Sequence, residues 1–418
     1  MDCGVQSGLK SRYRTPVLTL GASSILGVKG AKGREGESLM LGVALKMLMG
    51  DRVKYLGLVL GIGFATLLMT QQVSIFIGLL TWGANAVRDV REAEIWVMDP
   101  RVRQPDEGLA LNDQALYRVR GVEGVAWAAP YFRSTATLKT VEGQIAAVTL
   151  IGVDNQSMIG LPPENRDEAA QAIRGRNAVI LDRDGLRLIW SDGRDPIGQV
   201  AEINDNRIVV AGLTNALPTF AGLPVAYMKY TDAIAITPPE RNKLSFVLVR
   251  ATEGLSPGAL AARIERETGL KAMTREAFAW AGVNYIIENT GIPISFGVAI
   301  ALGVIVAVVI TALTLAMFIA ENLKTFGALK AIGVTNRQIM GMVLAQAWFV
   351  GLIGFGLGIG GTAAFLSQSA NNPSLEGFDM HWQVIAGAAA VIFLIVTLSA
   401  LVSVRRVLRM DPAIVFRG

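Results

Sequence analysis

Uncharged apolar residues gather in four long stretches of this chain, one near its start and three near its end. They cover residues 56–80, 292–320, 343–367 and 383–404. A helix needs roughly 20 apolar residues to cross the hydrocarbon core of a membrane, and an unpaired backbone group there costs several kcal/mol. The pattern predicts four transmembrane helices rather than buried helices of a soluble protein, which rarely stay uncharged past about 18 residues.

The polar segment between the first two stretches, residues 81–291, is long enough to fold as a domain. Short runs of alternating apolar and polar residues predict strands there, and Ser256-Pro257 and Gly269 are typical of the two ends of a helix. The predicted strands cover residues 94–98, 125–130, 134–140, 145–153, 178–181, 199–203, 207–213, 233–236 and 244–250. The chain is therefore predicted to be an α-helical membrane protein with a large α+β extracytoplasmic domain inserted between helices 1 and 2.

Strand, helix and strand recur at both ends of this domain, which favours pairing of the two ends in one split sheet. We expect an inner split subdomain made of residues 88–154 and 243–275, and an outer subdomain made of residues 155–242. Helical patterns flank the domain on both sides. The first helix is expected to continue beyond the membrane to about Val90, and residues 274–291 are expected to lead into the second.

Charges beside the apolar stretches predict the orientation of the chain, because Lys and Arg hold short loops in the cytoplasm. Both termini and the loop of residues 321–342 carry Lys and Arg. The loop of residues 368–382 carries Glu376 and Asp379 and neither Lys nor Arg. Both termini and the 321–342 loop are therefore predicted to be cytoplasmic, with the large domain and the 368–382 loop outside.

The two ends of the chain are interpreted as cytoplasmic segments. Residues 1–38 are expected to be a disordered tail, unless translation starts at Met40. Residues 39–55 have apolar and basic positions on different helical faces, which predicts an amphipathic helix on the inner membrane surface. Residues 405–418 are expected to be a second cytoplasmic tail.

Composition argues against several kinds of chemistry. The chain has one Cys, Cys3, and one His, His381, whereas zinc sites usually need three or four ligands. The glycine- and lysine-rich residues 27–36 lack the spacing of a phosphate-binding loop. The net charge of +5 comes from basic residues beside the spans, which favours the orientation above over nucleic-acid binding. We expect no catalytic residue, metal or cofactor in this chain.

Polar side chains interrupt the first apolar stretch at Thr70, Gln71, Gln72 and Ser74. At that depth such side chains usually form hydrogen bonds to a neighbouring helix, and a contact with a transported substrate is the alternative. Glycines spaced four apart predict faces on which helices approach closely. These pairs are Gly57/Gly61, Gly354/Gly358 and Gly356/Gly360.

The 321–342 loop carries the most specific pattern in the chain. Its sequence ENLKTFGALKAIGVTNRQI, which starts at Glu321, predicts two helical pieces broken at Gly333, with Thr335 or Asn336 capping the second. An apolar face exposed to the cytoplasm generally awaits a partner. The apolar residues of this otherwise basic loop are Phe326, Leu329, Ala331 and Ile332.

This loop resembles the cytoplasmic loop of ABC-transporter permeases of the MacB, FtsX and lipoprotein-release type, in which E-x-x-x-x-F/I-G-x-L-K/R-A-I/L-G-A-x-x-x-x-I recurs. Val334 departs from the usual small residue. The residues from Arg405 to Ala413 resemble the closing R-R-x-x-x-x-D-P-A of that family, and the order of one helix, one large domain and three helices is also similar. Residues 93–100, 116–125 and 129–130 look most like the DevC-type exporter permeases.

The resemblance implies a permease subunit of an exporter in the bacterial inner membrane, with its large domain in the periplasm. Two copies of a separate ATPase would bind ATP and Mg and dock on the loop, so this chain would be no enzyme. Long helices would transmit the motion to the periplasmic domains of a permease homodimer, which would expel substrate into a periplasmic adaptor and an outer-membrane channel. The docking residues so implied are Glu321, Lys324, Phe326, Gly327, Leu329, Lys330, Ile332, Gly333 and Arg337.

Two other functions are compatible with four spans and an external domain. An FtsX-like signalling subunit would activate a periplasmic cell-wall hydrolase without transporting cargo, but the size of the external domain favours the exporter. A membrane-anchored enzyme would need a cluster of titratable residues in a pocket, and the sequence shows no such cluster.

Overall fold

The computed structural model describes residues 52–190, 195–239, 243–369 and 377–408. The predicted tail of residues 1–38, residues 39–51 of the predicted amphipathic helix and the end of the chain from residue 409 lie outside the described residues. Within the described part, four helices are long and apolar enough to cross a membrane, which confirms the predicted spans. They are α2 (Arg52–Arg88), α9 (Ile292–Glu321), α11 (Asn336–Ser369) and α12 (Trp382–Leu408).

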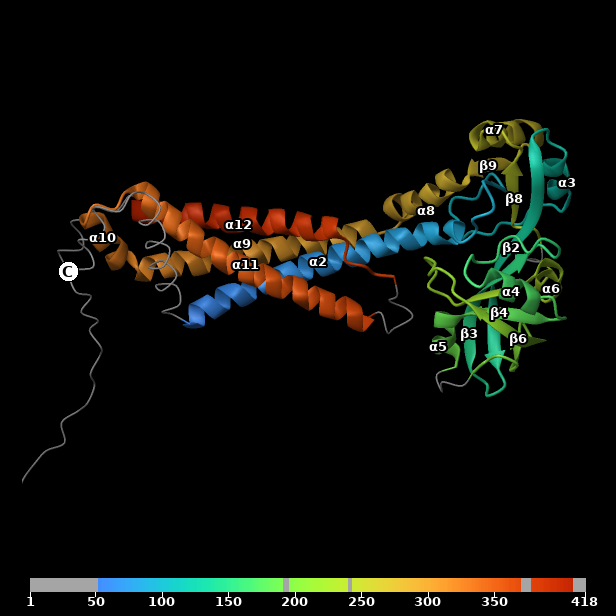
Figure 1. The fold of residues 1–418 in the computed structure, drawn as a ribbon, viewed down its shortest axis with the longest axis horizontal. Coiled ribbons are helices and arrows are strands. Elements are labelled where there is room, and N and C mark those ends of the chain that lie inside the picture. The colour runs from blue at the N-terminus through green and yellow to red at the C-terminus, as the bar shows by residue number, and fades with distance from the viewer. Residues whose placement is uncertain (1–51, 191–194, 240–242, 370–376, 409–418) are drawn as a thin grey trace, which may run out of the picture. The chain divides into compact units, whose positions relative to one another are not determined.

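A mixed domain of helices and strands lies between α2 and α9, as predicted (Figure 1). The helices extend past the apolar stretches that predicted them. α2 has 37 residues and continues outward to Arg88, which at 1.5 Å per residue is about 55 Å. α11 begins at Asn336, inside the predicted loop of residues 321–342, and a short helix, α10 (Leu323–Ala331), connects it to α9.

By their internal contacts the residues form two compact units. Among the described residues, one unit contains residues 52–58, Ala312–Val350 and residues 396–408, so it includes α10. The other contains Val59–Thr311 and Gly351–Ile395, so it includes the mixed domain and the remaining parts of the long helices.

The mixed domain contains an antiparallel sheet built from both of its ends. β1 lies between β8 and β9, and β8 also pairs with the first part of β2. One helix follows β1 and another follows β8, so two strand–helix–strand halves pair in one split sheet, as the sequence predicts. The elements are β1 (Ile95–Met98), α3 (Gln114–Arg120), β2 (Val125–Thr140), β8 (Phe246–Ala251), α7 (Pro257–Thr268) and β9 (Lys271–Thr274).

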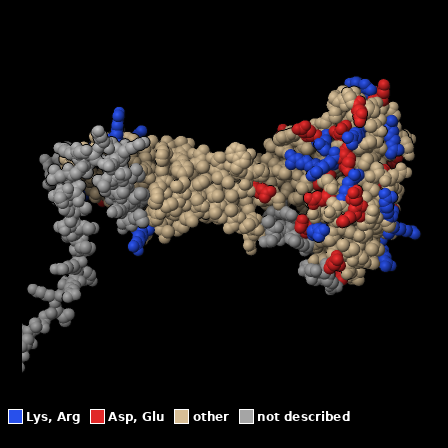
Figure 2. All heavy atoms as spheres, in the orientation of Figure 1, with Lys and Arg blue, Asp and Glu red and all other residues tan. Residues whose placement is uncertain are grey.

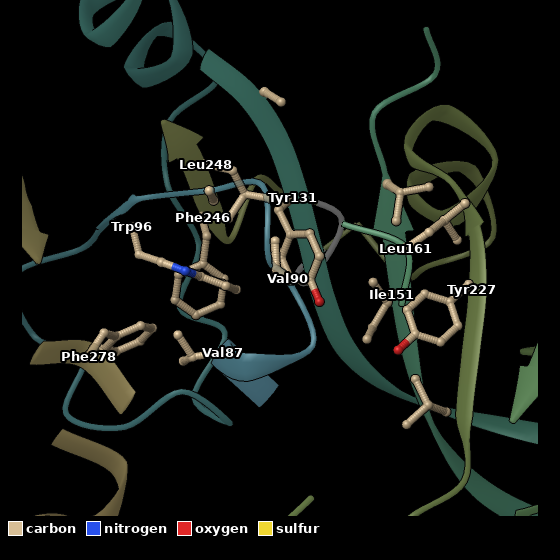
Figure 3. Packing of buried hydrophobic residues seen from close by; sticks show 14 of the residues in the cluster. Val87, Val90, Trp96, Tyr131, Ile151, Leu161, Tyr227, Phe246, Leu248 and Phe278 are labelled. Atoms are coloured by element: carbon tan, nitrogen blue, oxygen red, sulfur yellow. The ribbon is translucent and has the colours of Figure 1, made fainter. Parts of the chain in front are cut away.

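Successive residues of β1 are buried on opposite faces of this sheet. Ile95 and Val97 lie in one apolar cluster with residues of α3 and α7. Trp96 lies in another cluster with the outer end of α2 and with α8 (Arg275–Asn289). Figure 3 shows the Trp96 ring beside Phe246 and Phe278, with ring centroids 5.4 and 5.6 Å away. The outer ends of α2 and α8 are thus fixed to the sheet.

The middle of the domain forms a second sheet that closes on itself. Pairing runs from β2 to β3 and then through β7, β4, β6 and β5 back to β2. Inward-facing apolar residues fill the ring, as side chains fill small barrels. The elements are β3 (Ile145–Val153), α4 (Arg166–Ala172), β4 (Ala178–Asp182), α5 (Arg183–Ile189), β5 (Val200–Ile203), β6 (Asn206–Thr214), β7 (Val225–Lys229) and α6 (Tyr230–Ala235).

Three predictions about the domain are wrong. The inner subdomain does not extend to residue 154, because β3 and the second half of β2 pair within the closed sheet. β2 is one continuous strand from Val125 to Thr140 rather than two, and it belongs to both sheets. Residues 233–236 were expected in a strand but lie at the end of α6, where the Thr237 hydroxyl donates to the Ala233 carbonyl oxygen at 2.7 Å.

Candidate functional site

The 321–342 loop, predicted to be cytoplasmic, contains a short helix that ends in a fixed turn. α10 closes with a Schellman motif, in which the Val334 N–H donates to the Leu329 carbonyl at 3.0 Å and the Gly333 N–H to the Lys330 carbonyl at 3.1 Å. Gly333 has a φ of +102°, a conformation that a side chain disfavours. The break between the two helices therefore falls at Gly333, as predicted.

The start of α11 is fixed by a capping box. The Thr335 N–H donates to Gln338 Oε1 at 2.9 Å, and the Thr335 hydroxyl accepts from the Gln338 N–H at 3.4 Å. Thr335 is thus the cap, of the two residues that the sequence suggested. Hydrogen bonds on both sides of the turn hold the end of α10 and the start of α11 in one conformation.

The residues predicted to dock a partner do not share one exposed face. Ile332 is 62 % exposed, whereas the Phe326 side chain is completely buried. The predicted exposed apolar face is therefore wrong at Phe326, whose side chain is buried. Among the other predicted residues, Gly327 is buried, Leu329 and Lys330 are half-buried, and Glu321, Lys324, Gly333 and Arg337 are exposed.

The polar residues of the first span divide in a similar way. Thr70 is buried, and its hydroxyl lies 2.6 Å from the hydroxyl of Thr362 on α11. Gln71 and Gln72 are half-buried. The Ser74 hydroxyl is buried and has no hydrogen-bond partner among the described residues. At Thr70 the structure supports packing between helices, and no local pattern marks Thr362 as its partner.

The Thr70–Thr362 pair lies on a face where α2 and α11 approach closely. A Cβ added at Gly354 would lie 2.9 Å from the Val59 carbonyl oxygen, and one at Gly358 would overlap the Thr66 side chain and the Gly63 carbonyl. Of the predicted glycine pairs, Gly354/Gly358 therefore forms a close helix contact. Cβ atoms at Gly57, Gly356 and Gly360 would meet open space.

Replacing Thr362 by valine is expected to weaken this helix contact slightly. The change keeps the shape of the side chain and leaves the Thr70 hydroxyl with its bond to the Thr66 carbonyl at 2.8 Å. Hydrogen bonds between membrane helices contribute about 0.6 kcal/mol on average, so the thermal midpoint in detergent should fall by a small amount. A fall as large as that caused by Gly358→Leu would contradict this.

A loop of the mixed domain, residues 215–218, is held by the outer end of α2. The Asn85 side-chain amide donates to the Pro218 carbonyl at 2.8 Å, and the Leu217 N–H donates to the Asp89 carboxylate at 2.9 Å. The loop is also held by the closed sheet, since the Ala216 N–H donates to the Asp182 carboxylate at 3.3 Å. The 215–218 loop thus connects α2 to the outer part of the domain.

The two carboxyl groups that accept hydrogen bonds from the 215–218 loop, those of Asp89 and Asp182, are buried. Burial raises the pKa of Asp89 to about 7, and the nearby Asp182 contributes in the same direction. Burial also raises the pKa of Asp182. Among the described residues, no group of three or more His, Cys, Asp and Glu side chains is placed to hold a metal ion.

The loop before α12, of which residues 377–381 are described, also contacts α2. The Trp82 and Phe378 rings stack with centroids 4.8 Å apart, and a Cβ at Gly78 would overlap the Phe378 ring. Trp82, Asn85 and Asp89 follow one another at helical spacing, so this side of α2 carries contacts to two separate loops. No local pattern marks any of the three as a contact residue, because their partners are distant in sequence.

Comparison with known proteins places these elements in a family. Residues 55–267, about half of the chain, match the family described as MacB-like periplasmic core domain, and residues 297–412 match the FtsX-like permease C-terminal family. The chain belongs to the MacB/FtsX family of ABC-transporter permeases. It is a multipass protein of the inner membrane, and the narrower resemblance to DevC-type permeases stays a prediction.

A curated relative and several solved structures are similar to parts of this MacB/FtsX permease. The macrolide export ATP-binding/permease protein MacB of Bordetella avium (strain 197N) is 28 % identical over 200 residues, which are 46 % of this chain and 30 % of the relative. The chain thus spans about a third of the length of that relative.

The solved structures are similar to less than half of the chain each. The extracellular domain of the ABC-type transporter YknZ from Gram-positive bacteria is 14 % identical, with 44 % of this chain and 98 % of that one covered and a TM-score of 0.30. The periplasmic region of MacB from Actinobacillus actinomycetemcomitans is 14 % identical, with 49 % and 96 % covered and a TM-score of 0.33. A permease domain from Porphyromonas gingivalis is 16 % identical, with 45 % and 90 % covered and a TM-score of 0.30.

Proposed function

We propose that this chain is the permease subunit of an ABC exporter whose ATP hydrolysis takes place on a separate subunit. The observation that carries the proposal is the exposed end of α10, where Ile332 presents apolar surface next to a fixed turn. A large apolar side chain in that position favours contact with a protein partner. Two copies of the ATPase would bind ATP and Mg and dock there.

The long helices suit the transmission of movement from the ATPase to the periplasm. α10 follows α9 after the single residue Asn322, so a displacement of α10 acts directly on the end of a 30-residue helix. α2 is a continuous helix that ends in hydrogen bonds to the 215–218 loop. The exporter would use these rigid connections to drive its periplasmic domain and expel substrate, rather than conduct it along a polar channel.

The exporter is proposed to work as a homodimer, with a periplasmic adaptor and an outer-membrane channel. One face of α9 supports a second copy, because it is apolar and exposed over several turns. Its residues Ile294, Val298, Leu302 and Ile305 are all more than half exposed. Lipid covers whatever part of this face a second copy leaves free.

Replacing Ile332 by aspartate is expected to reduce the amount of ATPase that co-purifies with the permease at least tenfold. The substitution places a charge on the exposed end of α10 and leaves the buried Phe326 in place. The measurement is ATP hydrolysis and mass spectrometry of the detergent-solubilised complex from its native membrane. Val141→Asp is a matched control, since Val141 is 74 % exposed but belongs to the external domain.

Equal co-purification with Ile332→Asp and with the unchanged chain would contradict docking at α10. An ATPase recovered together with a cell-wall hydrolase, and without an adaptor, would contradict the exporter and favour the FtsX-like signalling function. Phe326→Asp is unsuitable for this test, because a charge at a completely buried position disrupts the unit itself.

A further inference from the structure

A cavity of about 630 Å³ lies between the outer end of α2, α8 and the 215–218 loop. All of its walls belong to the unit that contains the mixed domain. Figure 2 shows Lys and Arg side chains gathered where the helices enter that domain. The residues that line the cavity are Ala84, Arg88, Arg91, Leu217, Arg275, Glu276, Ala279, Trp280 and Val283.

Three guanidinium groups line this cavity, and none of them forms an ion pair with a described acidic side chain. They belong to Arg88, Arg91 and Arg275, and all three are exposed. Arg275 donates to the Arg91 carbonyl oxygen at 2.9 Å, which holds its side chain against the cavity wall. Glu276 is the one acidic residue in the lining. The cavity therefore has an excess of positive charge, and guanidinium groups bind phosphate and carboxylate well.

Other residues of the lining are apolar. Trp280 is 58 % exposed and Leu217 is 41 % exposed, although both are large apolar side chains. Ala279 and Val283 lie on the same side of α8 as Trp280. An aromatic ring with one exposed face can cover an alkyl chain or a ring of a ligand. The cavity thus offers apolar and cationic surface side by side.

We propose that this cavity binds an anionic amphiphile, a molecule with a phosphate or carboxylate head and an apolar body. Arg88, Arg91 and Arg275 hold the head, and Trp280 and Leu217 cover the body. The ligand comes from the aqueous side, because Arg88 lies eight residues beyond the predicted span, about 12 Å farther along α2. As a cargo site this inference rests on the proposed export function.

The test uses the full chain in phosphatidylcholine nanodiscs, with octyl phosphate as the probe and empty nanodiscs as background. Calorimetric titration of the variant with Arg88, Arg91 and Arg275 all replaced by glutamine should show binding weakened at least tenfold. The matched control replaces Arg118, Arg207 and Arg266 by glutamine, since these arginines are exposed but lie outside the cavity. This control should bind octyl phosphate like the unchanged chain.

Two further probes separate the head from the body. Inorganic phosphate and octanol should each bind at least tenfold more weakly than octyl phosphate. The Trp280→Ala variant should bind octyl phosphate more weakly than the unchanged chain and should bind inorganic phosphate equally well. Equal binding by the triple variant and the unchanged chain would overturn the site. Inorganic phosphate that binds as tightly as octyl phosphate would show an anion site only.

The source of the ligand is tested by adding phosphatidylglycerol to the nanodiscs. Unchanged octyl phosphate binding is expected, whereas loss of binding would show that a bilayer lipid fills the cavity and would overturn the aqueous source. Because these titrations need no ATPase, their failure leaves the export function standing. Failure of the Ile332→Asp test would leave the binding site standing and remove only its role in export.

Discussion

Replacing Gly282 by alanine is expected to push α2 and α8 apart and to destabilise the protein by about 1–3 kcal/mol, the usual cost of overpacking a core. A Cβ at Gly282 would overlap the carbonyl oxygen of Gly83 on α2 and would lie 3.0 Å from Pro105 Cδ. The overlapping atom belongs to backbone, so no side-chain rotation relieves it. Both helices are fixed to the sheet beside this point, so the contact of α2 and α8 with the sheet must shift as well.

The measurement is the thermal midpoint of the full chain in detergent, with Gly297→Ala as the control. Gly297 lies on α9, and a Cβ there would meet nothing within 4 Å. Alanine in place of glycine inside a helix otherwise adds about 0.5–1 kcal/mol, so the control should be unchanged or more stable. Gly83→Ala should cost less than Gly282→Ala, because its nearest neighbour is the flexible end of Ile286 at 2.6 Å. Equal midpoints for Gly282→Ala and Gly297→Ala would contradict the close helix contact.

The sequence could predict elements whose signal is local. Four uncharged stretches predicted the spans, and alternating residues predicted β1, β3 and β8 close to their observed bounds. Gly333 predicted the turn after α10, with Thr335 or Asn336 as the cap of α11, because a glycine stop and a polar cap are read from neighbouring residues. Ala233–Ile236 was misread because four apolar and small residues fit a strand as well as one turn of helix.

The functional contacts depend on residues that are distant in the sequence. Gly83 and Gly282 meet only because α2 and α8 converge on one sheet, and Asp89 meets Leu217 across most of the domain. Helical periodicity places Phe326, Leu329 and Ile332 in one stripe but does not say where the stripe turns from buried to exposed. That boundary depends on the packing of other helices, which no local pattern records.

Asp89 is expected to make the stability of the protein depend on pH in the opposite sense to an ordinary surface carboxylate. Its pKa is about 7 in the folded protein, against 3.8 for a free side chain. The folded state therefore binds more protons than the unfolded state between these values. The contribution of Asp89 to the free energy of unfolding therefore falls as the pH rises from about 4 to about 7 and is constant at higher pH.

The size of this effect follows from the same shift. One pKa unit corresponds to about 1.4 kcal/mol, so ionised Asp89 costs up to roughly 4 kcal/mol at pH 8. Asp89→Asn does not titrate, and its amide oxygen still accepts the Leu217 N–H. The variant should match the unchanged chain near pH 4 and exceed it by a few kcal/mol at pH 8, with a higher thermal midpoint there.

The control for this prediction is a carboxyl shifted in the other direction. Hydrogen bonds from Arg101 lower the pKa of Asp99, so its contribution to stability is present above the unfolded pKa and is lost as the pH falls. Asp99→Asn should therefore be less stable than the unchanged chain at pH 8 and equal to it at low pH. If Asp89→Asn, like Asp99→Asn, made the protein less stable at pH 8, the folded protein would have to stabilise the Asp89 carboxyl as an anion. In that case the Leu217 N–H, Arg133 and Arg91, which lower its pKa, would outweigh its burial and the nearby Asp182.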